Sequence, residues 1–237
     1  LLQVMDKHQV KKMIFSSSAT VYDAEKNLAP FTETDRLNTT NPYGTTKLAM
    51  EFLLKDMAQH KGFSVVCLRY FNPVGAHHSG LLGENPKWIP TNLVPFLLRV
   101  AKKEIESITV FGDNYPTPDG TCIRDYIHIE DLAQAHLQSY DYLLQQEVEL
   151  QTKENWSPSK FEVFNIGTWT GKSVKEILII TESIVWESIS HTVWERRDGD
   201  VAISVANPTK AKQVLHWEPQ KTIVDAVQDA WNFYSRA

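Results

Sequence analysis

The sequence predicts an α/β protein that forms the later half of a doubly wound parallel sheet and carries a smaller α/β lobe. Apolar runs of strand length alternate with segments of helical periodicity, which favours a parallel sheet covered by helices. The chain has 237 residues, 42% of them hydrophobic and 22% charged, which is enough for a sizeable core. No internal repeat or low-complexity segment interrupts the alternation.

The first part of the chain has the clearest local signals. We expect the end of a helix at residues 1–5, a strand at 12–18, a loop at 24–42, a helix at 42–62 and a strand at 64–71. Pro42 suits the first turn of a helix, and Gly62 suits its end. Because residues 1–5 read as a helix already under way, we expect the chain to be the later part of a longer protein.

The second part mixes short strands with helices. We expect a long loop at residues 72–91, a helix at 93–103, a strand at 107–111 and a turn-rich stretch at 112–122. A helix at 130–145, a polar surface insertion at 146–160 and a strand at 161–166 should follow. Further helices are expected to begin near Ser173 and at Asn207–Pro208, and the last to span 222–235. Residues 1–75 are assigned to the sheet domain, parts of which recur later, and 76–237 mainly to a substrate lobe.

Composition excludes several classes of function. The net charge of −5 argues against a general grip on nucleic acid or an anionic membrane. The longest aliphatic run, residues 177–180, is too short to cross a bilayer. Two cysteines cannot form a disulfide framework or a cysteine-rich zinc site, so we expect a reducing, cytoplasmic setting. His77-His78 lacks partners at metal-ligand spacing, and no metal is expected.

Tyr43 and Lys47 are the strongest local signal for chemistry. Residues at i and i+4 lie one above the other on a helix face, so the ammonium lies near the phenol and favours the phenolate. Lowering a phenol pKa from about 10 to about 7 takes roughly 4 kcal/mol, part of which one lysine supplies. The product is a general base for a sugar hydroxyl. By itself the pair also fits an exposed Tyr beside a solvated Lys.

The strand at 12–18 strengthens the catalytic interpretation. It ends in Ser16-Ser17-Ser18, about 25 residues before the tyrosine. Since strand C-termini line the ligand crevice of a parallel sheet, Ser18 can bind the hydroxyl that Tyr43 deprotonates. The alternative is a serine run that only caps the strand end.

Several longer motifs carry a family resemblance. They are Ser-Ser-Ser-Ala-Thr-Val-Tyr at 16–22, Asn-Pro-Tyr-Gly-Thr-Thr-Lys at 41–47, Leu-Arg-Tyr-Phe-Asn-Pro-Val-Gly-Ala-His at 68–77, Phe-Gly-Asp-Asn-Tyr-Pro-Thr-Pro-Asp-Gly-Thr at 111–121 and Arg-Asp-Tyr-Ile-His-Ile-Glu-Asp-Leu-Ala at 124–133. Together they resemble UDP-glucose (UDP-galactose) 4-epimerase, an extended short-chain dehydrogenase/reductase with a Rossmann-like sheet. The resemblance runs through almost the whole chain and is weakest at 146–160 and 178–195.

The resemblance implies a mechanism and a cofactor. NAD takes a hydride from C4 of a UDP-hexose, the 4-keto sugar rotates, and the hydride returns to its other face. By motif position Tyr43 is the base, Lys47 holds the nicotinamide ribose, Ser18 assists with the hydroxyl proton and Tyr70 packs by the nicotinamide. The family also implies a homodimer formed through the helix at 43–60 and its neighbour.

The same resemblance assigns the UDP-sugar site. Asn72 matches a diphosphate or sugar contact, and Arg124 and Arg197 match two arginines on the diphosphate, where a guanidinium binds oxygens in a bidentate way. Asp200 matches the acid on the ribose. The remaining positions match the strip along the substrate (Asn92, Leu93) and the segment around uracil (Thr109, Val110, Phe111). A small residue, Ser204, resembles the form that admits UDP-N-acetylhexosamines.

The chain also departs from the family pattern. None of its ten glycines forms a dinucleotide fingerprint after a strand, so the part that holds the adenosine and pyrophosphate of NAD is not expected here. Asp23 replaces a usual Gly, and we expect it to tolerate a left-handed backbone. The unusual sequence at 178–195 leaves the direction of Arg197 open. Residues 167–173 miss a phosphate-binding loop by one position and predict a strand–turn–helix junction.

Three functional hypotheses remain. The first is an epimerase or its catalytic fragment, and the second is a non-catalytic fragment or isoform that binds a UDP-sugar or a partner but cannot hold NAD. The third is a sugar-nucleotide dehydratase or decarboxylase on the same fold. Dehydratases need an acid pair after the strand-end serine, but this chain has Ala19-Thr20 there, which argues against the third hypothesis.

Overall fold

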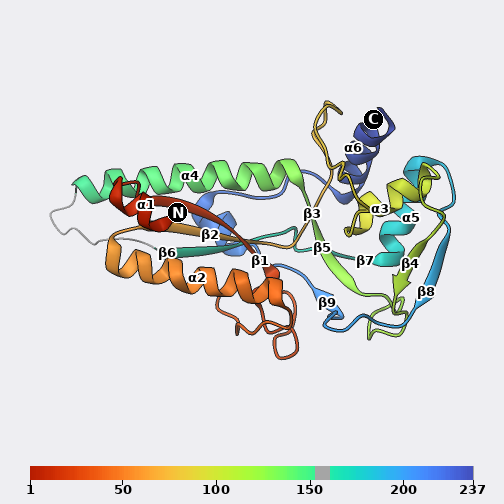
Figure 1. Cartoon of the computed structure of the whole chain (residues 1–237), viewed down its shortest axis with the longest axis horizontal. Helices are drawn as coiled ribbons and strands as arrows, with labels where there is room; N and C mark the ends of the chain where they lie inside the picture. The colour runs from red at the N-terminus through yellow and green to blue at the C-terminus, as the bar shows by residue number, and fades with distance from the viewer. Residues whose placement is uncertain (153–160, 237) are drawn as a thin grey trace.

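The computed structural model describes residues 1–152 and 161–236 and has two lobes (Figure 1). In one lobe a three-stranded sheet lies between two long helices. The other lobe combines short strands with three helices. The predicted α/β class with a parallel sheet is confirmed.

The larger sheet has the strand order β1-β2-β6, and every pairing is parallel. Its strands are β1 (Lys12–Ser18), β2 (Ser64–Tyr70) and β6 (Phe161–Ile166). The register places Ser18 opposite Tyr70 and Tyr70 opposite Ile166, so these three residues form a row at the C-terminal edge. In a parallel sheet this edge is where ligands bind.

Helices α2 (Pro42–Lys61) and α4 (Ile129–Thr152) cover the two faces of this sheet (Figure 1). Successive side chains of a strand point to opposite faces. Accordingly Val66 and Leu68 belong to a core cluster with residues of α4, whereas Val65 and Cys67 belong to one with residues of α2. The apolar run of β2 is therefore buried on both sides.

The ends of α2 are set by the residues that the sequence indicates. Asn41 Oδ1 accepts a hydrogen bond from the Gly44 backbone N–H at 2.8 Å, and Pro42 occupies the first helical position. Gly62 ends the helix with φ of 68°, a conformation that glycine adopts at little cost. The short helix α1 (Leu2–Lys7) packs beside α2 through Leu2 and Met5.

The second lobe is organised around β5 (Ile123–His128), which has three neighbouring strands. It pairs in parallel with β3 (Asn72–Val74) and β9 (Ile203–Ser204), and antiparallel with β7 (Gly171–Ser173). A separate parallel pair joins β4 (Ile108–Phe111) to β8 (His191–Trp194).

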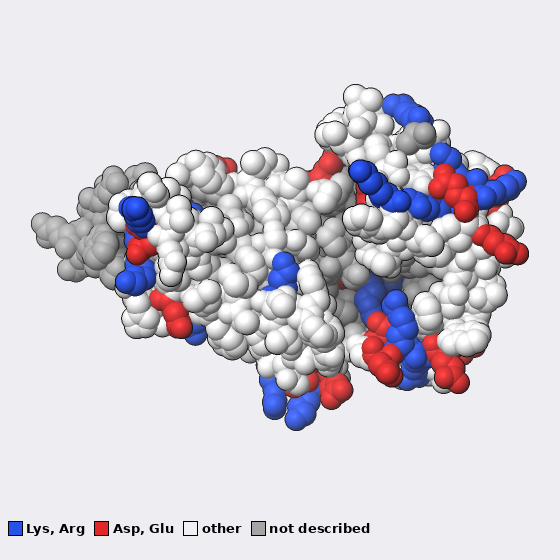
Figure 2. All heavy atoms as spheres, in the orientation of Figure 1, with Lys and Arg blue, Asp and Glu red and all other residues white. Residues whose placement is uncertain are grey.

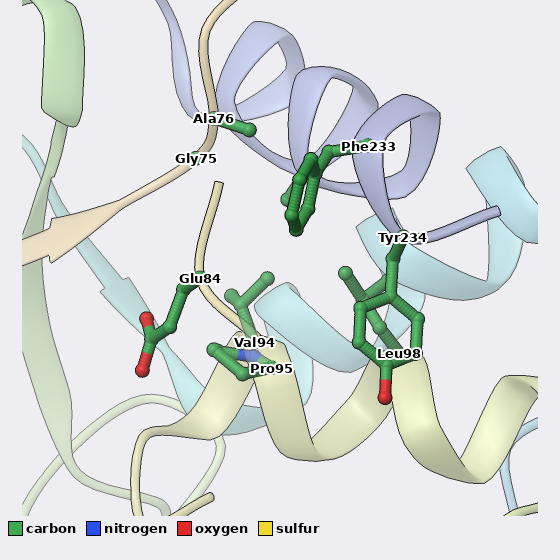
Figure 3. A pocket seen from close by; sticks show the side chains of 9 residues that line it. Gly75, Ala76, Glu84, Val94, Pro95, Leu98, Phe233 and Tyr234 are labelled. Atoms are coloured by element: carbon green, nitrogen blue, oxygen red, sulfur yellow. The ribbon is translucent and has the colours of Figure 1, made fainter. Parts of the chain in front are cut away.

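Three helices, α3 (Leu93–Ala101), α5 (Val174–Val185) and α6 (Ile223–Arg236), share the core of this lobe. Figure 3 shows Phe233 and Tyr234 of α6 facing Val94, Pro95 and Leu98 of α3. The cavity between them measures about 10 Å³, room for about one water molecule. It is too small for a sugar nucleotide.

Several elements differ from the sequence predictions. The expected loop at 72–91 contains β3, and β5, β7, β8 and β9 were not predicted. Helix α4 continues to Thr152 through part of the expected insertion, and residues 153–160 of that insertion lie outside the described residues. The helix expected to begin at Asn207–Pro208 is present but short: residues 209–210 are α-helical and continue into the π-helical segment Ala211–Leu215.

The surface carries charges of both signs. On the face shown in Figure 2, acidic and basic side chains are intermingled and gather mainly on the lobe at the right. Within the described ranges, no helix is long and apolar enough to span a membrane. The expected domain boundary near residue 75 stays a prediction.

Candidate functional site

Tyr43 and Lys47 lie together at the N-terminal end of α2. Lys47 Nζ is 5.4 Å from the centre of the Tyr43 ring and 5.2 Å from that of Phe15. It donates a hydrogen bond to the Ser16 carbonyl oxygen at 2.9 Å, which fixes the amine at the end of β1. Tyr43 is 53% exposed, so its hydroxyl is accessible to a ligand.

Gly44 allows α2 to approach the 3₁₀ turn Ala19–Val21 that follows β1. A Cβ at Gly44 would lie 2.6 Å from the Thr20 carbonyl oxygen, closer than any side chain allows. On the other side of this contact, Ser18 Oγ accepts hydrogen bonds from the Thr20 N–H at 3.2 Å and the Thr20 hydroxyl at 3.0 Å. Because these bonds use only its lone pairs, the Ser18 hydroxyl can still donate to a ligand.

Tyr70 and Asn72 follow each other where the chain leaves the larger sheet for the second lobe. The half-buried Tyr70 has its ring 6.5 Å from that of His136, on the α4 side of the sheet. Asn72 begins β3 and pairs with Tyr126. The two residues therefore lie between the Tyr43 region and the second lobe.

A charged cluster in the second lobe contains four of the residues singled out in the sequence. Asp200 lies 3.7 Å from Arg124 Nη2 and accepts a hydrogen bond from Arg197 Nε at 2.9 Å. The Arg197 guanidinium lies over the Phe111 ring at 4.8 Å, which resolves its direction despite the unusual sequence at 178–195. We call Phe111, Arg124, Arg197 and Asp200 the arginine cluster.

The backbone fixes Arg124 within this cluster. Its Nη1 donates hydrogen bonds to the carbonyl oxygens of Ile123 at 2.9 Å and Val201 at 2.7 Å. Ser204 pairs with Arg124 across the β5–β9 register. The residue expected to control sugar size thus lies beside a residue expected to bind diphosphate.

The other expected substrate residues lie on β4 and α3. Thr109 and Phe111 are partly exposed, but Val110 between them is buried, so its side chain faces the interior. Asn92 stands at the N-cap of α3 and donates to Glu84 Oε1 at 3.3 Å, and Leu93 packs against the lobe core. In the structure described, no hydrogen bond or ion pair joins Asn92 or Leu93 to the arginine cluster.

Comparisons with a family model and with curated relatives both match nearly the whole chain. A family model described as GDP-mannose 4,6 dehydratase matches residues 1–230. The UDP-glucose 4-epimerases of Bacillus subtilis and Erwinia amylovora are both 41% identical to the chain, over 236 and 238 residues, covering 99% and 100% of it. The chain belongs to the UDP-glucose 4-epimerase family.

A solved structure supports the same assignment. The UDP-glucose 4-epimerase of Bifidobacterium longum, crystallised in complex with NAD⁺ and UDP, is 44% identical, covers the whole chain and superposes with a TM-score of 0.89. The chain spans about two thirds of these epimerases: 66% of the Bacillus relative, and 67% of the Erwinia relative and the Bifidobacterium chain.

Asp125 is a buried residue that the sequence reasoning did not single out. Its carboxylate accepts hydrogen bonds from the Thr168 backbone and hydroxyl, the Trp169 N–H and the Ala206 N–H. Burial raises its pKa, and these hydrogen bonds oppose the rise. The segment that nearly matches a phosphate-binding loop in this epimerase homologue therefore binds a carboxylate of its own chain.

The Glu51 carboxylate, four residues after Lys47 on α2, is a second buried group that the sequence reasoning did not single out. The buried Glu51 carboxylate accepts hydrogen bonds from the Ser17 hydroxyl and from Arg69 Nε, the latter at 2.9 Å. Arg69 Nη1 donates to the Tyr22 hydroxyl at 3.1 Å, and burial, opposed by Arg69, raises the pKa of Tyr22 to about 12. An arginine in an otherwise apolar strand was the available sequence signal, because a buried charge needs a partner.

Asp23, the departure from the epimerase pattern after Tyr22, does not adopt the expected backbone. Its φ is not positive, so the prediction of a left-handed backbone at this residue is wrong. The carboxylate is buried and lies 3.1 Å from Arg36 Nε. A charge pair replaces the conformational freedom of glycine at this position.

The two histidines of the 72–91 segment have a partner that is distant in sequence. Glu130 Oε1 lies 2.7 Å from His78 Nδ1 and 3.6 Å from His77 Nε2, a grouping compact enough for a metal ion. However, Lys221 Nζ lies 2.9 Å from Glu130 Oε2 and 3.0 Å from Asp229. Because an ammonium already neutralises these carboxylates, we keep the prediction that the site has no metal.

Proposed function

We propose that this chain carries the proton-transfer and UDP-sugar-binding residues of an NAD-dependent 4-epimerase that interconverts UDP-galactose and UDP-glucose. The observation that carries the proposal is the Tyr43–Lys47 pair, held at the C-terminal edge of a parallel sheet by the Lys47–Ser16 hydrogen bond. Family membership and the arginine cluster of the second lobe support it. We place the reaction in the cytoplasm, where the free cysteines Cys67 and Cys122 stay reduced.

Tyr43 acts as the general base toward the 4-hydroxyl of the hexose. Its accessible side chain accepts the proton in the phenolate form, which the nearby ammonium of Lys47 stabilises, and so becomes a phenol. Ser18 orients the hydroxyl with its remaining donor. When the sugar is reduced again, Tyr43 returns the proton, so the side chain is restored after each turnover.

The residues present fit the nicotinamide end of NAD. Bound NAD supplies the hydride acceptor and donor for C4 of the sugar. Lys47 uses one of its three N–H donors on Ser16, and the others are available for ribose hydroxyls. Tyr70 packs beside the nicotinamide. No glycine fingerprint for the pyrophosphate occurs in the sequence, and Asp125 already binds the amides of Thr168 and Trp169.

The arginine cluster holds the UDP portion. Arg124 and Arg197 bind the diphosphate oxygens and Asp200 accepts hydrogen bonds from ribose hydroxyls. The segment around uracil presents the partly exposed side chains of Thr109 and Phe111 and only the backbone of the buried Val110. Asn72, Asn92 and Leu93 line the sugar. Binding the diphosphate requires Arg197 to exchange part of its interaction with Asp200 for phosphate oxygens.

Titration calorimetry of the 237-residue chain with UDP tests this assignment. We expect wild type to bind UDP and Arg124→Met to weaken binding about 10-fold or more, because a charged hydrogen bond is lost. Lys26→Met removes one positive charge outside the cluster and should bind UDP like wild type. Circular dichroism of each variant checks folding.

An epimerase assay then separates the two remaining hypotheses. Conversion of UDP-galactose with added NAD⁺, abolished by Tyr43→Phe, supports an active enzyme. UDP binding without NAD binding or conversion supports a non-catalytic fragment, which the missing glycine fingerprint favours for this chain alone. A folded chain that neither binds UDP nor converts UDP-galactose would contradict the proposal.

The small side chain of Ser204 leads us to propose that UDP-N-acetylglucosamine is also accepted. A larger residue there would crowd an acetamido group beside Arg124. The test compares UDP-N-acetylglucosamine with UDP-glucose for wild type and Ser204→Tyr. Equal discrimination by both proteins would remove Ser204 from the explanation.

We also propose a homodimer through α1 and α2. Val4 of α1 and Phe52 and Leu53 of α2 are exposed apolar side chains on neighbouring helices, and such a surface suits a second copy of the chain. Light scattering after gel filtration should give twice the chain mass for wild type and the monomer mass for Phe52→Glu. A wild-type monomer would exclude this interface.

A further inference from the structure

Tyr115 is a buried side chain with an unused polar group. It lies in the turn after β4 and is only 5% exposed. Among the residues that the structure describes, none forms a hydrogen bond with its hydroxyl. Burying a hydroxyl without a partner costs free energy, so this one calls for an explanation.

The ring of Tyr115 is held tightly in place. The Arg196 guanidinium lies 4.1 Å from the ring centre, and Arg196 Nε donates to Asn114 Oδ1 at 2.6 Å. The ring also lies against the backbone of Gly112, where a Cβ would be 2.6 Å from Tyr115 Cε2. These contacts restrict the ring, and its hydroxyl is buried.

The same arrangement links Tyr115 to the arginine cluster. Consecutive arginines stack on two nearby rings: Arg196 on Tyr115 and Arg197 on Phe111. The charges that act on the Tyr115 hydroxyl include Asp200 and Arg124, the pair at the centre of that cluster. Burial first, and then Asp200, raises its pKa, so the hydroxyl stays protonated and can donate.

We propose that the Tyr115 hydroxyl donates a hydrogen bond to an oxygen of the nucleotide bound by Arg124, Arg197 and Asp200. This inference rests on the proposed function, because it concerns the same UDP site. The acceptor is a ribose or diphosphate oxygen, both of which the cluster is suited to hold. Tyr115 is then a binding residue whose hydroxyl gains its partner only in the complex.

A purely structural role makes the opposite prediction. Tyr115→Phe keeps the ring and its contact with Arg196 and deletes only the hydroxyl. If the hydroxyl serves the ligand, this variant should melt at or above the temperature of ligand-free wild type and bind UDP about 3- to 10-fold more weakly. If the hydroxyl instead stabilises the free protein, the variant should melt lower and bind UDP with unchanged affinity.

Tyr234→Phe is the matched control. Tyr234 is also 5% exposed, but its hydroxyl donates to Glu104 Oε2 at 2.9 Å. This variant should melt lower and bind UDP normally. Both variants are compared by differential scanning fluorimetry without ligand and by calorimetry with UDP. A parallel titration with uridine reports whether the acceptor lies on the nucleoside or on the diphosphate, and either position agrees with the proposal.

The outcomes separate this inference from the function beneath it. If wild type and Tyr115→Phe bind UDP with equal affinity, the proposed role of Tyr115 is wrong, but the nucleotide site remains supported. A lowered melting temperature of Tyr115→Phe with unchanged affinity would lead to the same conclusion. If wild type does not bind UDP, the nucleotide site and this inference fail together.

Discussion

The Asp125 carboxylate accepts hydrogen bonds from the backbone N–H and the hydroxyl of Thr168, at 2.8 and 2.6 Å. This contact fastens the loop after β6 to β5, and so joins the larger sheet to the second lobe. Gly167 is part of the arrangement, because a Cβ there would lie 2.7 Å from Asp125 Oδ2.

Asp125→Asn should destabilise the protein by about 3 kcal/mol. The new NH₂ group would face N–H or O–H donors and leave at least one of them buried without an acceptor. Urea unfolding measures the change, with the surface variant Asp113→Asn as the control. A loss below about 1 kcal/mol would contradict the importance of these hydrogen bonds.

Gly44→Ala should disturb the Tyr43 region more than its helix propensity suggests. Alanine favours a helix over glycine by about 1 kcal/mol, but its Cβ would press on the Thr20 carbonyl oxygen. We expect a lower free energy of unfolding and a changed ¹³Cζ chemical shift of Tyr43. Gly62→Ala, with no atom within 4 Å of the new Cβ, should cost stability through its φ of 68° alone. An unchanged Tyr43 signal in Gly44→Ala would refute the steric argument.

The Glu51–Arg69 pair should show strong coupling. Glu51→Leu alone leaves a buried guanidinium without its carboxylate and should cost about 3–5 kcal/mol. The double variant Glu51→Leu/Arg69→Met should recover much of this loss, because no charge remains buried. A double-mutant cycle of urea unfolding measures the coupling, and simple additivity of the two single losses would exclude it.

Glu130 should contribute to stability in a pH-dependent way. Burial raises its pKa, but hydrogen bonds from Lys221 and His78 outweigh burial and lower the pKa to about 2 from 4.5. The contribution is therefore fully present above pH 4.5 and is lost as the pH falls toward about 2. Urea unfolding should give wild type a larger free energy of unfolding than Glu130→Gln at neutral pH. The difference between the two should shrink as the pH falls through this range. A constant difference would argue against the linkage.

The elements that the sequence predicts correctly have strong local signals. The apolar run of β1, and the Asn41 cap, Pro42 start and Gly62 end of α2, all act within a few residues. Strand β5 was missed because its sequence, Ile-Arg-Asp-Tyr-Ile-His, has no apolar run or alternation. It is a strand because β3, β7 and β9, distant in sequence, supply its partners. Only tertiary structure provides that information.

The candidate site divides in the same way. Tyr43 and Lys47 are one helical turn apart, so their proximity follows from helix geometry. Arg124 and Asp200 are 76 positions apart, and their assignment depended on family resemblance rather than on local pattern. Tyr115 and Arg196 carry no motif-level signal of contact, because stacking depends on how β4 and β8 align.

Adjacent positions of β5 carry opposite charges that face opposite sides of the strand: Asp125 toward the interior and Arg124 toward the proposed diphosphate. Inserting or deleting one residue just before them would exchange the two sides. A guanidinium would then be forced among amide donors, and a carboxylate would repel an anionic ligand. The register of β5 thus decides whether a positive or a negative side chain faces the ligand. A one-residue slip would therefore abolish binding of an anionic ligand as well as lower the stability of the protein.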